Sequence, residues 1–476
     1  MKNKISFLLI IFILLSCSKD RDDEIVELTG DYEISDFIWK GLNEFYYWQE
    51  SITMLADSID DNKNTYTKLI SENSDPKPFF NSLLSPKDRF SIIVDDYVEL
   101  QNTLQGIVAS NGMEFGLSLQ CSECEEVFGF VKYVHPDSDA FNKNIKRGDL
   151  FTHINGIKLN KNNYRELLYN DGLVYEISLS VYENGIFNLT GDKIELIKEE
   201  NFQKNPIHVN KIINYESNSI GYLMYNQFLS DYNEELNEVF SNFKSGNITD
   251  LILDLRYNGG GSVSNCVILS SLITGQFTGE VFSKQNWNSK LNEYWNSQNP
   301  DQLINKFVSS LSTGESLNSL NLQKIYIITS NQSASASELL INGLDSHIQV
   351  IQVGDKTVGK NVASITIHDY IDNDGNKNPN HTYAMQPIVL AIENSAGFSD
   401  YQDGLEPDHF IKEVSNNLGV LGSISDPLLL NTINIISGSG RYDINPENPF
   451  GEIIYDSEMK NNQRLIIETD ILNFQK

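Results

Sequence analysis

The first candidate for chemistry is a serine-rich motif, Ser-Ala-Ser-Ala-Ser-Glu, at residues 333–338. It lies between an apolar segment that ends at Thr329 and another that begins at Leu339, so the sequence predicts a strand, then the serines, then a helix. A serine at the start of a helix lies beside free backbone amides and the positive end of the helix dipole. Such amides can stabilise the negative oxygen of a tetrahedral acyl intermediate. Ser335 is therefore a candidate nucleophile for acyl transfer.

The same motif also has a purely structural interpretation. Ser335 and Glu338 have the spacing of a capping box, in which the serine begins the helix and the glutamate bonds back to the serine's amide. Most sequences of this kind only begin a helix. A chemical role for Ser335 therefore depends on a base elsewhere in the chain.

The best candidate for that base is Lys360, which follows Ser335 by 25 residues in a glycine-punctuated loop at residues 354–360. A lysine in water, with a pKa of about 10.4, is a poor base at neutral pH. Burial disfavours the charged form, so a dry pocket would supply a neutral amine. Spacing alone favours an ordinary surface lysine, which is the alternative. His347 is the histidine nearest to Ser335 in sequence, but no triad motif marks it.

A third motif, Asp-Leu-Arg-Tyr-Asn-Gly-Gly-Gly at residues 254–261, follows a segment expected to form a buried strand. A turn of this composition lets backbone amides approach a ligand closely. No Gly-Lys-[Ser/Thr] follows it, which excludes a phosphate-binding loop.

In this order and at this spacing, the three motifs resemble those of the C-terminal-processing (tail-specific) serine peptidases. The resemblance spans about residues 35–430 and implies a crotonase/ClpP-like α/β serine peptidase domain with a Ser-Lys dyad. It further implies that Ser335 is the nucleophile and Lys360 the general base. On the same basis, the backbone amides of Ala336 and Gly260 are expected to form the oxyanion hole.

The sequence departs from the family pattern at two places. The family often has a lysine-orienting glutamine four residues after the lysine; here that residue is Ser364, whose hydroxyl can accept a hydrogen bond from Lys360. Some members have an aspartate eleven residues after the serine; here Ser346 stands there, and we assign no role to the neighbouring Asp345. These changes bear on rate and pH optimum more than on reaction class. The alternative function is a catalytically weak or inactive peptide-binding or ligand-binding lipoprotein on the same fold.

The rest of the chain predicts an α/β multidomain protein. Residues 200–430 alternate predicted strands and helices, the pattern of α/β layers, and residues 431–476 form a C-terminal extension. Residues 31–105 are expected to be a helical N-terminal domain, because apolar side chains recur at three- and four-residue steps within residues 36–48.

Residues 106–195 change to short alternating strands broken by glycine, and this segment resembles a PDZ domain. Strands are expected at residues 115–119 and 127–134. The resemblance implies that extended C-terminal peptides add a strand at one sheet edge. A β-rich spacer that binds nothing is the alternative. The residues that the resemblance places at the peptide-binding edge are Phe115, Gly116 and Leu117.

The N-terminus predicts export. Residues 1–16 contain two lysines and an apolar run too short to span a bilayer, as in a signal peptide. The segment Leu-Leu-Ser-Cys that ends at Cys17 resembles the lipobox of bacterial lipoproteins, which implies lipidation of this cysteine. Residues 17–30 form an acidic tether similar to the export tag of some Bacteroidetes-type surface lipoproteins. The expected location is the outer membrane, facing the periplasm or the cell surface, with the lipid anchor as the membrane contact.

Composition excludes some functions. The 476 residues include 35 Lys+Arg and 65 Asp+Glu, and a formal charge of −30 repels phosphate backbones, which disfavours nucleic-acid binding. Cys121 and Cys124 are expected to form a local disulfide in an oxidising envelope, because a zinc site would need a second ligand pair. Residues 372–376 predict a hairpin turn, since the frame of a calcium loop lacks its carboxylates there. We expect no metal or cofactor, and a protein or peptide as the substrate.

Overall fold

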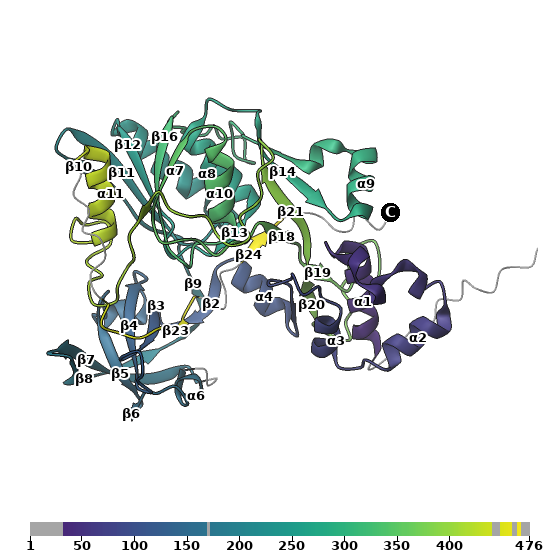
Figure 1. Cartoon of the computed structure of the whole chain (residues 1–476), viewed down its shortest axis with the longest axis horizontal. Helices are drawn as coiled ribbons and strands as arrows, with labels where there is room; N and C mark the ends of the chain where they lie inside the picture. Colours follow the sequence, from purple (N-terminus) through teal and green to yellow (C-terminus); the bar gives the residue numbers. More distant parts are fainter. Residues whose placement is uncertain (1–31, 169–171, 440–447, 459–463, 468–476) are drawn as a thin grey trace, which may run out of the picture.

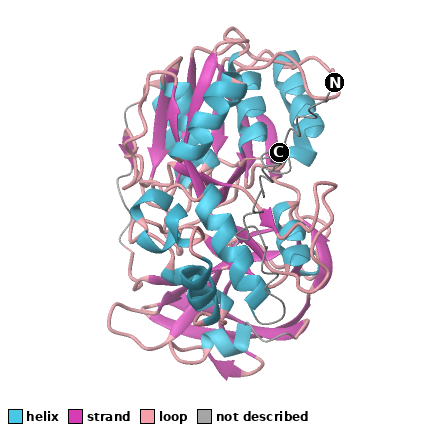
Figure 2. Ribbon diagram, turned by 90° about the vertical axis from the view of Figure 1, so that its right-hand side faces the viewer, coloured by secondary structure: helices cyan, strands magenta, loops and turns pink. Residues whose placement is uncertain are grey.

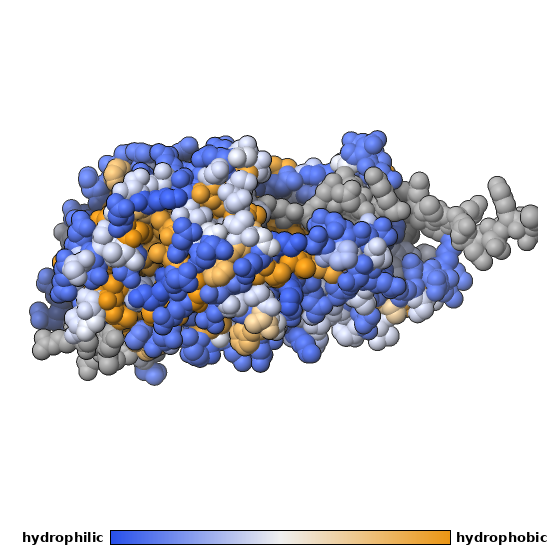
Figure 3. Space-filling view, turned by 90° about the horizontal axis from the view of Figure 1, so that it is seen from above, coloured by the Kyte–Doolittle hydropathy of each residue, from blue (hydrophilic) through white to orange (hydrophobic). Residues whose placement is uncertain are grey.

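The computed structural model of the chain describes residues 32–168, 172–439, 448–458 and 464–467. The predicted signal peptide, the lipidation site Cys17 and nearly all of the region before the first helix lie outside these residues. Figure 1 shows N-terminal helices on one side, a small β domain below, and a larger α/β domain above. No helix within the described ranges is long and apolar enough to cross a membrane. On the face shown in Figure 3, hydrophilic residues cover most of the surface, and hydrophobic ones show between them.

The N-terminal region is mainly helical, as predicted. Its elements are α1 (Glu33–Phe45), the short 3-10 helices η3 (Gln49–Ser51), η4 (Thr53–Leu55) and η5 (Asp57–Ile59), α2 (Lys63–Ser71), α3 (Pro76–Ser82), β1 (Ile92–Val94) and α4 (Tyr97–Leu104). The predicted apolar stripe of α1 is buried, which attaches this helix to the main hydrophobic core. Trp48 lies beyond the end of α1 and is only half-buried.

The small β domain has one main sheet in the order β23-β3-β4-β5-β7-β8, with β6 beside β5, and a separate pair formed by β2 and β9. Its elements are β2 (Ile107–Ser110), β3 (Met113–Leu119), β4 (Val127–Val134), α5 (Asp139–Asn142), β5 (Leu150–Ile154), β6 (Ile157–Lys158), α6 (Tyr164–Leu168), β7 (Val174–Glu183), β8 (Ile186–Ile197), β9 (Glu199–Gln203) and β23 (Ile453–Asp456). The predicted strands at 115–119 and 127–134 are present, and Cys121 and Cys124 form the expected disulfide.

The centre of the α/β domain is a six-stranded sheet in the order β10-β11-β12-β16-β17-β22. Neighbouring strands from β11 to β22 are parallel, and β10 is antiparallel to β11. The strands are β10 (Ile207–Tyr215), β11 (Asn218–Tyr225), β12 (Asp250–Asp254), β16 (Lys324–Thr329), β17 (Gln349–Gly354) and β22 (His409–Phe410). Figure 2 shows strands of this domain upright beside its helices.

Helices cover both faces of this sheet. Because side chains alternate along a strand, Leu253 belongs to one buried cluster and Ile252 to another. The first cluster contains side chains of α7 (Asn233–Ser245), α8 (Val263–Thr274) and α10 (Ala336–Asp345), and the second those of α11 (Pro427–Ser437). The helix α11 runs through residue 430, where the predicted peptidase domain ends.

A second sheet of the α/β domain has the order β13-β24-β18-β21-β14-β15. These strands are β13 (Gly260–Ser262), β14 (Val281–Trp287), β15 (Ile304–Lys306), β18 (Val362–Ser364), β21 (Ile388–Asn394) and β24 (Arg464–Ile466). The remaining elements are η6 (Ser230–Tyr232), α9 (Ser289–Gln298), η7 (Pro300–Leu303), β19 (Ile367–His368) and β20 (Ala384–Gln386), and β20 joins β1 to β19. The turn predicted at 372–376 is present, closed by an antiparallel bridge between Tyr370 and Lys377.

Candidate active site

Ser335 lies between β16 and α10, in the predicted strand-to-helix order. Its φ is 66° and its ψ is −111°, whereas an ordinary N-cap residue has β-region dihedrals. A non-glycine residue with this backbone conformation is strained, and such strain gathers at functional sites. The Ser335 Oγ is buried and, within the described ranges, has no hydrogen-bond partner. The Ser335 side chain faces the Glu338 backbone amide as in a capping box, but its Oγ makes no hydrogen bond of ordinary geometry with any described residue, so the serine is not an ordinary cap.

Glu338 connects the serine to the lysine loop. Its Oε2 accepts hydrogen bonds from the amides of Ser335 at 2.7 Å and Lys360 at 2.8 Å. Its Oε1 accepts from the amide of Gly359 at 2.6 Å and the hydroxyl of Thr357 at 2.5 Å. This side chain is fully buried, and burial raises the pKa of Glu338 although its hydrogen bonds act to lower it. The capping-box spacing predicts the bond to Ser335, but no local pattern predicts the bonds to a loop about twenty residues later.

Lys360 lies between β17 and β18 and is 1% exposed, so the surface-lysine alternative is wrong. Its Nζ lies 4.9 Å from the centre of the Phe90 ring. Phe90 comes from the N-terminal region, in the segment between α3 and β1, so two distant parts of the chain enclose the amine. Burial of this kind is what a lysine base requires.

The glycine turn after β12 is tied to the serine loop through Asn258. The Asn258 carbonyl accepts bonds from the Ala334 amide at 3.1 Å and the Ser337 hydroxyl at 2.9 Å. Glycine is required at Gly261, because its φ is 135° and a Cβ there would lie 2.2 Å from the carbonyl oxygen of Phe228. The backbone of the turn therefore lies against the loop that carries Ser335.

Two backbone amides were predicted to form the oxyanion hole. Ala336 is the first residue of α10, so its amide has no acceptor within the helix. The Gly260 amide donates to Asn258 Oδ1 at 2.8 Å in this structure. The pairing of these two amides in an oxyanion hole stays a prediction.

The remaining residues considered from the sequence lie in other parts of the structure. Ser364 is buried in β18, and its carbonyl accepts from the Ile467 amide at 3.1 Å; its role toward Lys360 stays a prediction. His347 Nε2 bonds to the Val281 carbonyl at 2.9 Å, at the far end of α10. Asp345, also at that end, is exposed. The predicted peptide-binding residues lie in β3 of the small domain.

A buried charged network supports the glycine turn. Arg256 bonds to Asp254 at 2.7 Å, Asp426 at 2.9 Å and Glu413 at 2.8 Å. Arg147, from the small domain, also bonds to Glu413, at 2.6 Å. Burial would raise the pKa of Glu413, but the two arginines outweigh it and lower that pKa to about 2. This network joins the small domain to the turn, and nothing in the sequence predicted it.

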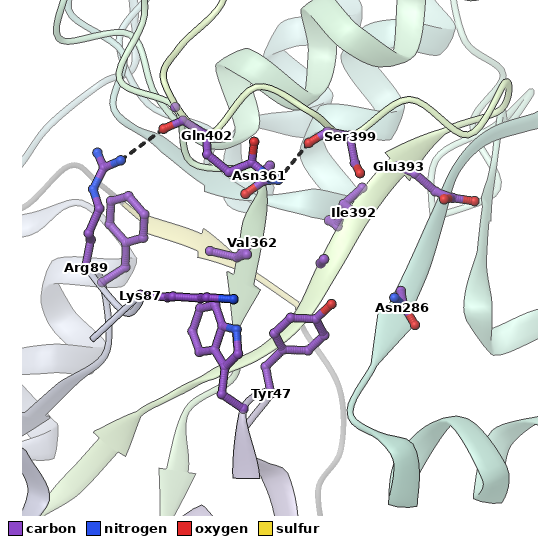
Figure 4. Close-up of a pocket in the computed structure, with 14 residues that line it drawn as sticks. Tyr47, Lys87, Arg89, Asn286, Asn361, Val362, Ile392, Glu393, Ser399 and Gln402 are labelled. Atoms are coloured by element: carbon purple, nitrogen blue, oxygen red, sulfur yellow. Dashed lines mark hydrogen bonds between the residues drawn. The ribbon is translucent and has the colours of Figure 1, made fainter. Parts of the chain in front are cut away.

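A cavity of about 470 Å³ lies next to the lysine loop, between the N-terminal region and the α/β domain (Figure 4). Gly359 and Asn361, on either side of Lys360, line it, and so does Phe90. Arg89 closes one side by donating to the Gln402 carbonyl at 3.0 Å. Neither Ser335 nor Lys360 is among the residues that line this cavity.

Comparisons with known proteins agree with this architecture. The model of Peptidase family S41 matches residues 219–406, and that of the Peptidase S41 N-terminal domain matches residues 33–92. Together these matches cover about half of the chain. The chain belongs to peptidase family S41, which confirms the predicted family.

Two relatives illustrate the likeness. A "Probable CtpA-like serine protease" from Staphylococcus epidermidis is 21% identical over 338 residues, which are 71% of this chain and 58% of that protein. The chain thus spans less than two thirds of that relative's length. The crystal structure of a protein assigned to the S41 proteases, from Bacteroides fragilis NCTC 9343, is 22% identical with a TM-score of 0.68, covering 85% of this chain and 98% of that one. The predicted α/β multidomain fold, with a helical N-terminal segment, is confirmed.

Proposed function

We propose that this chain is a serine endopeptidase in which Ser335 is the nucleophile and Lys360 the general base. The observation that carries the proposal is the backbone of Ser335, which holds a buried hydroxyl at a helix start in a strained conformation. Glu338 fixes the amides of both Ser335 and Lys360. A structural cap would need neither the strain nor the link to a buried lysine.

The reaction begins with a neutral Lys360 amine, which takes the proton of the Ser335 hydroxyl as Oγ attacks the peptide carbonyl carbon. The lysine then returns this proton to the leaving amine as the peptide bond breaks. Water, deprotonated by the same amine, hydrolyses the acyl-serine and restores the enzyme. The amides of Ala336 and of the glycine turn, with Gly260 as the candidate, stabilise the oxyanion in both steps.

Substrate recognition is assigned to the small β domain as a PDZ-like module. Its β3 edge, which includes Phe115, Gly116 and Leu117, would bind the C-terminal tail of an envelope or extracellular protein as an added strand. This edge accommodates an antiparallel strand, because β23 pairs with it. The name of the CtpA-like relative, a probable serine protease, supports the peptidase part of this proposal. The proposal also places the chain at the outer membrane through lipidated Cys17.

The test compares three variants of the full chain, purified in detergent, on an unfolded protein with an apolar C-terminal tail. Ser335→Ala and Lys360→Ala should each lower kcat/KM by about 1,000-fold or more. Lys356→Ala is the matched control: this lysine lies in the same loop, on the surface, where it pairs with Glu406. Cleavage that survives loss of Ser335 or Lys360 would refute the assignment.

A second candidate is a peptide-binding protein without turnover. Ser335 and Lys360 are 0% and 1% exposed, so the site is closed in this structure, and Ser364 replaces the glutamine of many family members. Binding of tail peptides without cleavage, and no labelling of Ser335 by a fluorophosphonate, would favour it.

A further inference from the structure

The edge predicted to bind peptides is occupied by the chain itself. β23 pairs antiparallel with β3 in a register that sets Tyr455 opposite Leu117 and Asp456 opposite Gly116. Figure 1 shows β23, near the C-terminal end of the sequence, beside β3 and β4. The segment is therefore bound as an added strand, the mode by which a sheet edge binds a separate peptide.

Next to this strand, a buried lysine bonds to two carboxylates of the segment. Lys132 Nζ lies 2.8 Å from Asp456 Oδ1 and 3.0 Å from Glu458 Oε2. The Tyr133 hydroxyl donates to Glu458 Oε1 at 2.6 Å, and Gln332 Nε2 donates to Asp456 Oδ2 at 2.6 Å. Lys132 is 1% exposed. We call these three residues, Lys132, Tyr133 and Gln332, the carboxylate pocket.

The carboxylate pocket selects for acidic side chains. Burial alone would lower the pKa of Lys132, but Asp456 and Glu458 outweigh it and raise that pKa, so the ammonium stays charged. A buried ion pair that loses one partner leaves an uncompensated charge, which is strongly unfavourable. A neutral segment would therefore bind here much less well than one with carboxylates two residues apart.

The carboxylate pocket also contacts both loops of the candidate active site. Gln332 lies three residues before Ser335, in the serine loop. Lys132 Nζ lies 4.4 Å from the centre of the ring of Tyr257, a residue of the glycine turn.

Further along, the same C-terminal part of the chain enters the second sheet. The backbone of β24 lies between β13 and β18, with Arg464 opposite Gly260 and Ile466 opposite Ser364. Figure 1 shows β24 beside these two strands. The strand β13 begins at Gly260, the candidate oxyanion glycine, and β18 begins two residues after Lys360. β24 therefore occupies the strand position between the segments that carry these two candidate groups.

We propose that residues 450–458 and 464–467 are an intramolecular competitor of peptide substrates, anchored by Asp456 and Glu458 in the carboxylate pocket. The ligand class of that pocket is a peptide with two carboxylates two residues apart, and a substrate tail of this kind displaces the segment. The competition for the active site rests on the proposed peptidase function; the binding of acidic peptides does not.

The binding test uses a fluorescent peptide with the sequence of residues 450–458 and the full chain in detergent. Since a tethered ligand acts at a high effective concentration, the wild-type chain should bind the peptide weakly. The double variant Asp456→Asn/Glu458→Gln should bind it about tenfold tighter or more, as measured by anisotropy. Glu452→Gln, an exposed change in the same segment, is the matched control and should behave as wild type. Equal affinity for all three proteins would overturn the proposal.

Two further measurements separate specificity from misfolding. A peptide with Asn in place of Asp456 and Gln in place of Glu458 should bind the double variant about tenfold more weakly or worse; equal binding of both peptides contradicts the carboxylate pocket. In the unmodified chain, excess acidic peptide should speed hydrogen exchange of the Ser457 amide, which belongs to the segment itself and bonds to the Phe115 carbonyl. Unchanged exchange at saturating peptide would show that the segment is a permanent strand and would overturn the proposal.

The accessibility test separates this inference from the proposed function. Fluorophosphonate should label Ser335 about tenfold faster in the double variant than in wild type or Glu452→Gln. Equal labelling rates in these three proteins would overturn the competition while leaving the peptidase assignment intact. If the chain proves not to be labelled at all, the peptidase proposal fails, and the anisotropy measurements alone decide whether acidic peptides bind.

Discussion

Helices α8 and α10 lie in the same domain, and a serine precedes each, yet the two serines have different states. Ser262 has a φ of −67° and a ψ of 129°, and its Oγ accepts from the Asn265 amide at 3.1 Å. Ser335 has a positive φ, and its buried Oγ has no partner within the described ranges. The same residue type at the same local position is a hydrogen-bonded cap in one helix and, in the other, a hydroxyl that makes no hydrogen bond of ordinary geometry with the part of the chain that the structure describes.

The difference shows what frees a serine for chemistry. At α8 the serine satisfies an amide of the helix's first turn itself. At α10 the glutamate accepts the bond from the serine's amide and also binds the lysine loop. Glu338 is therefore the positioning residue that makes the start of α10 different from that of α8.

The largest expected effect follows from Glu338→Gln. A glutamine Nε2 would face amide donors that now bond to a carboxylate oxygen, leaving buried groups unsatisfied. We expect a loss of about 3 kcal/mol in the free energy of unfolding and of about 100-fold in kcat/KM, measured by urea unfolding and peptide cleavage. Glu406→Gln, a surface change, should cost less than about 0.5 kcal/mol. If both variants behave alike, Glu338 does not position the site.

The pH dependence of cleavage tests the role of Glu338 at α10. Burial raises the pKa of Glu338, so the folded state takes up this proton at a higher pH than the unfolded chain. The sign means that protonating Glu338 does not by itself favour unfolding as pH falls, but it weakens the acceptor for both loops. Below that pKa, protonation of Glu338 should therefore add a fall in log kcat/KM of up to one per pH unit. Glu338→Gln should lack this added fall; an identical profile would contradict this prediction.

Local patterns predicted those parts of the site that are close in sequence. The strand-to-helix order at Ser335 follows from apolar segments and a capping motif, and the burial of α1 follows from its helical period. Lys360 was found through its spacing within a family resemblance, because a lysine in a loop carries no period of its own.

Contacts between distant segments could not be predicted in this way. Phe90 lies against Lys360, Arg147 bonds to Glu413, and Lys132 bonds to Asp456, each across more than 200 residues. Only packing of the domains brings such pairs together, and neither hydrophobic periodicity nor turn chemistry encodes it. For the same reason the sequence predicted a C-terminal extension without indicating that it pairs with β3, β13 and β18.

A smaller effect tests the structural serine. Ser262→Ala removes the acceptor of the Asn265 amide, so we expect a loss of about 1 kcal/mol in the free energy of unfolding. Ser312→Ala, at an exposed turn position, should stay within about 0.5 kcal/mol of wild type. A loss at Ser262 no larger than at Ser312 would mean that the observed bond does not cap α8.

The smallest expected effect is that of glycine at each serine, which should change the free energy of unfolding in opposite directions. Glycine adopts a positive φ without steric cost, so Ser335→Gly relieves strain, although it also increases the entropy of the unfolded chain. We expect a net gain of about 0.5 kcal/mol in the free energy of unfolding, together with loss of cleavage. Ser262→Gly should instead lose a few tenths of a kcal/mol, about 0.3. Urea unfolding of both variants decides the matter. If Ser335→Gly instead lowers the free energy of unfolding, as Ser262→Gly is expected to do, the backbone of Ser335 is not strained. Its positive φ would then not separate it from an ordinary cap.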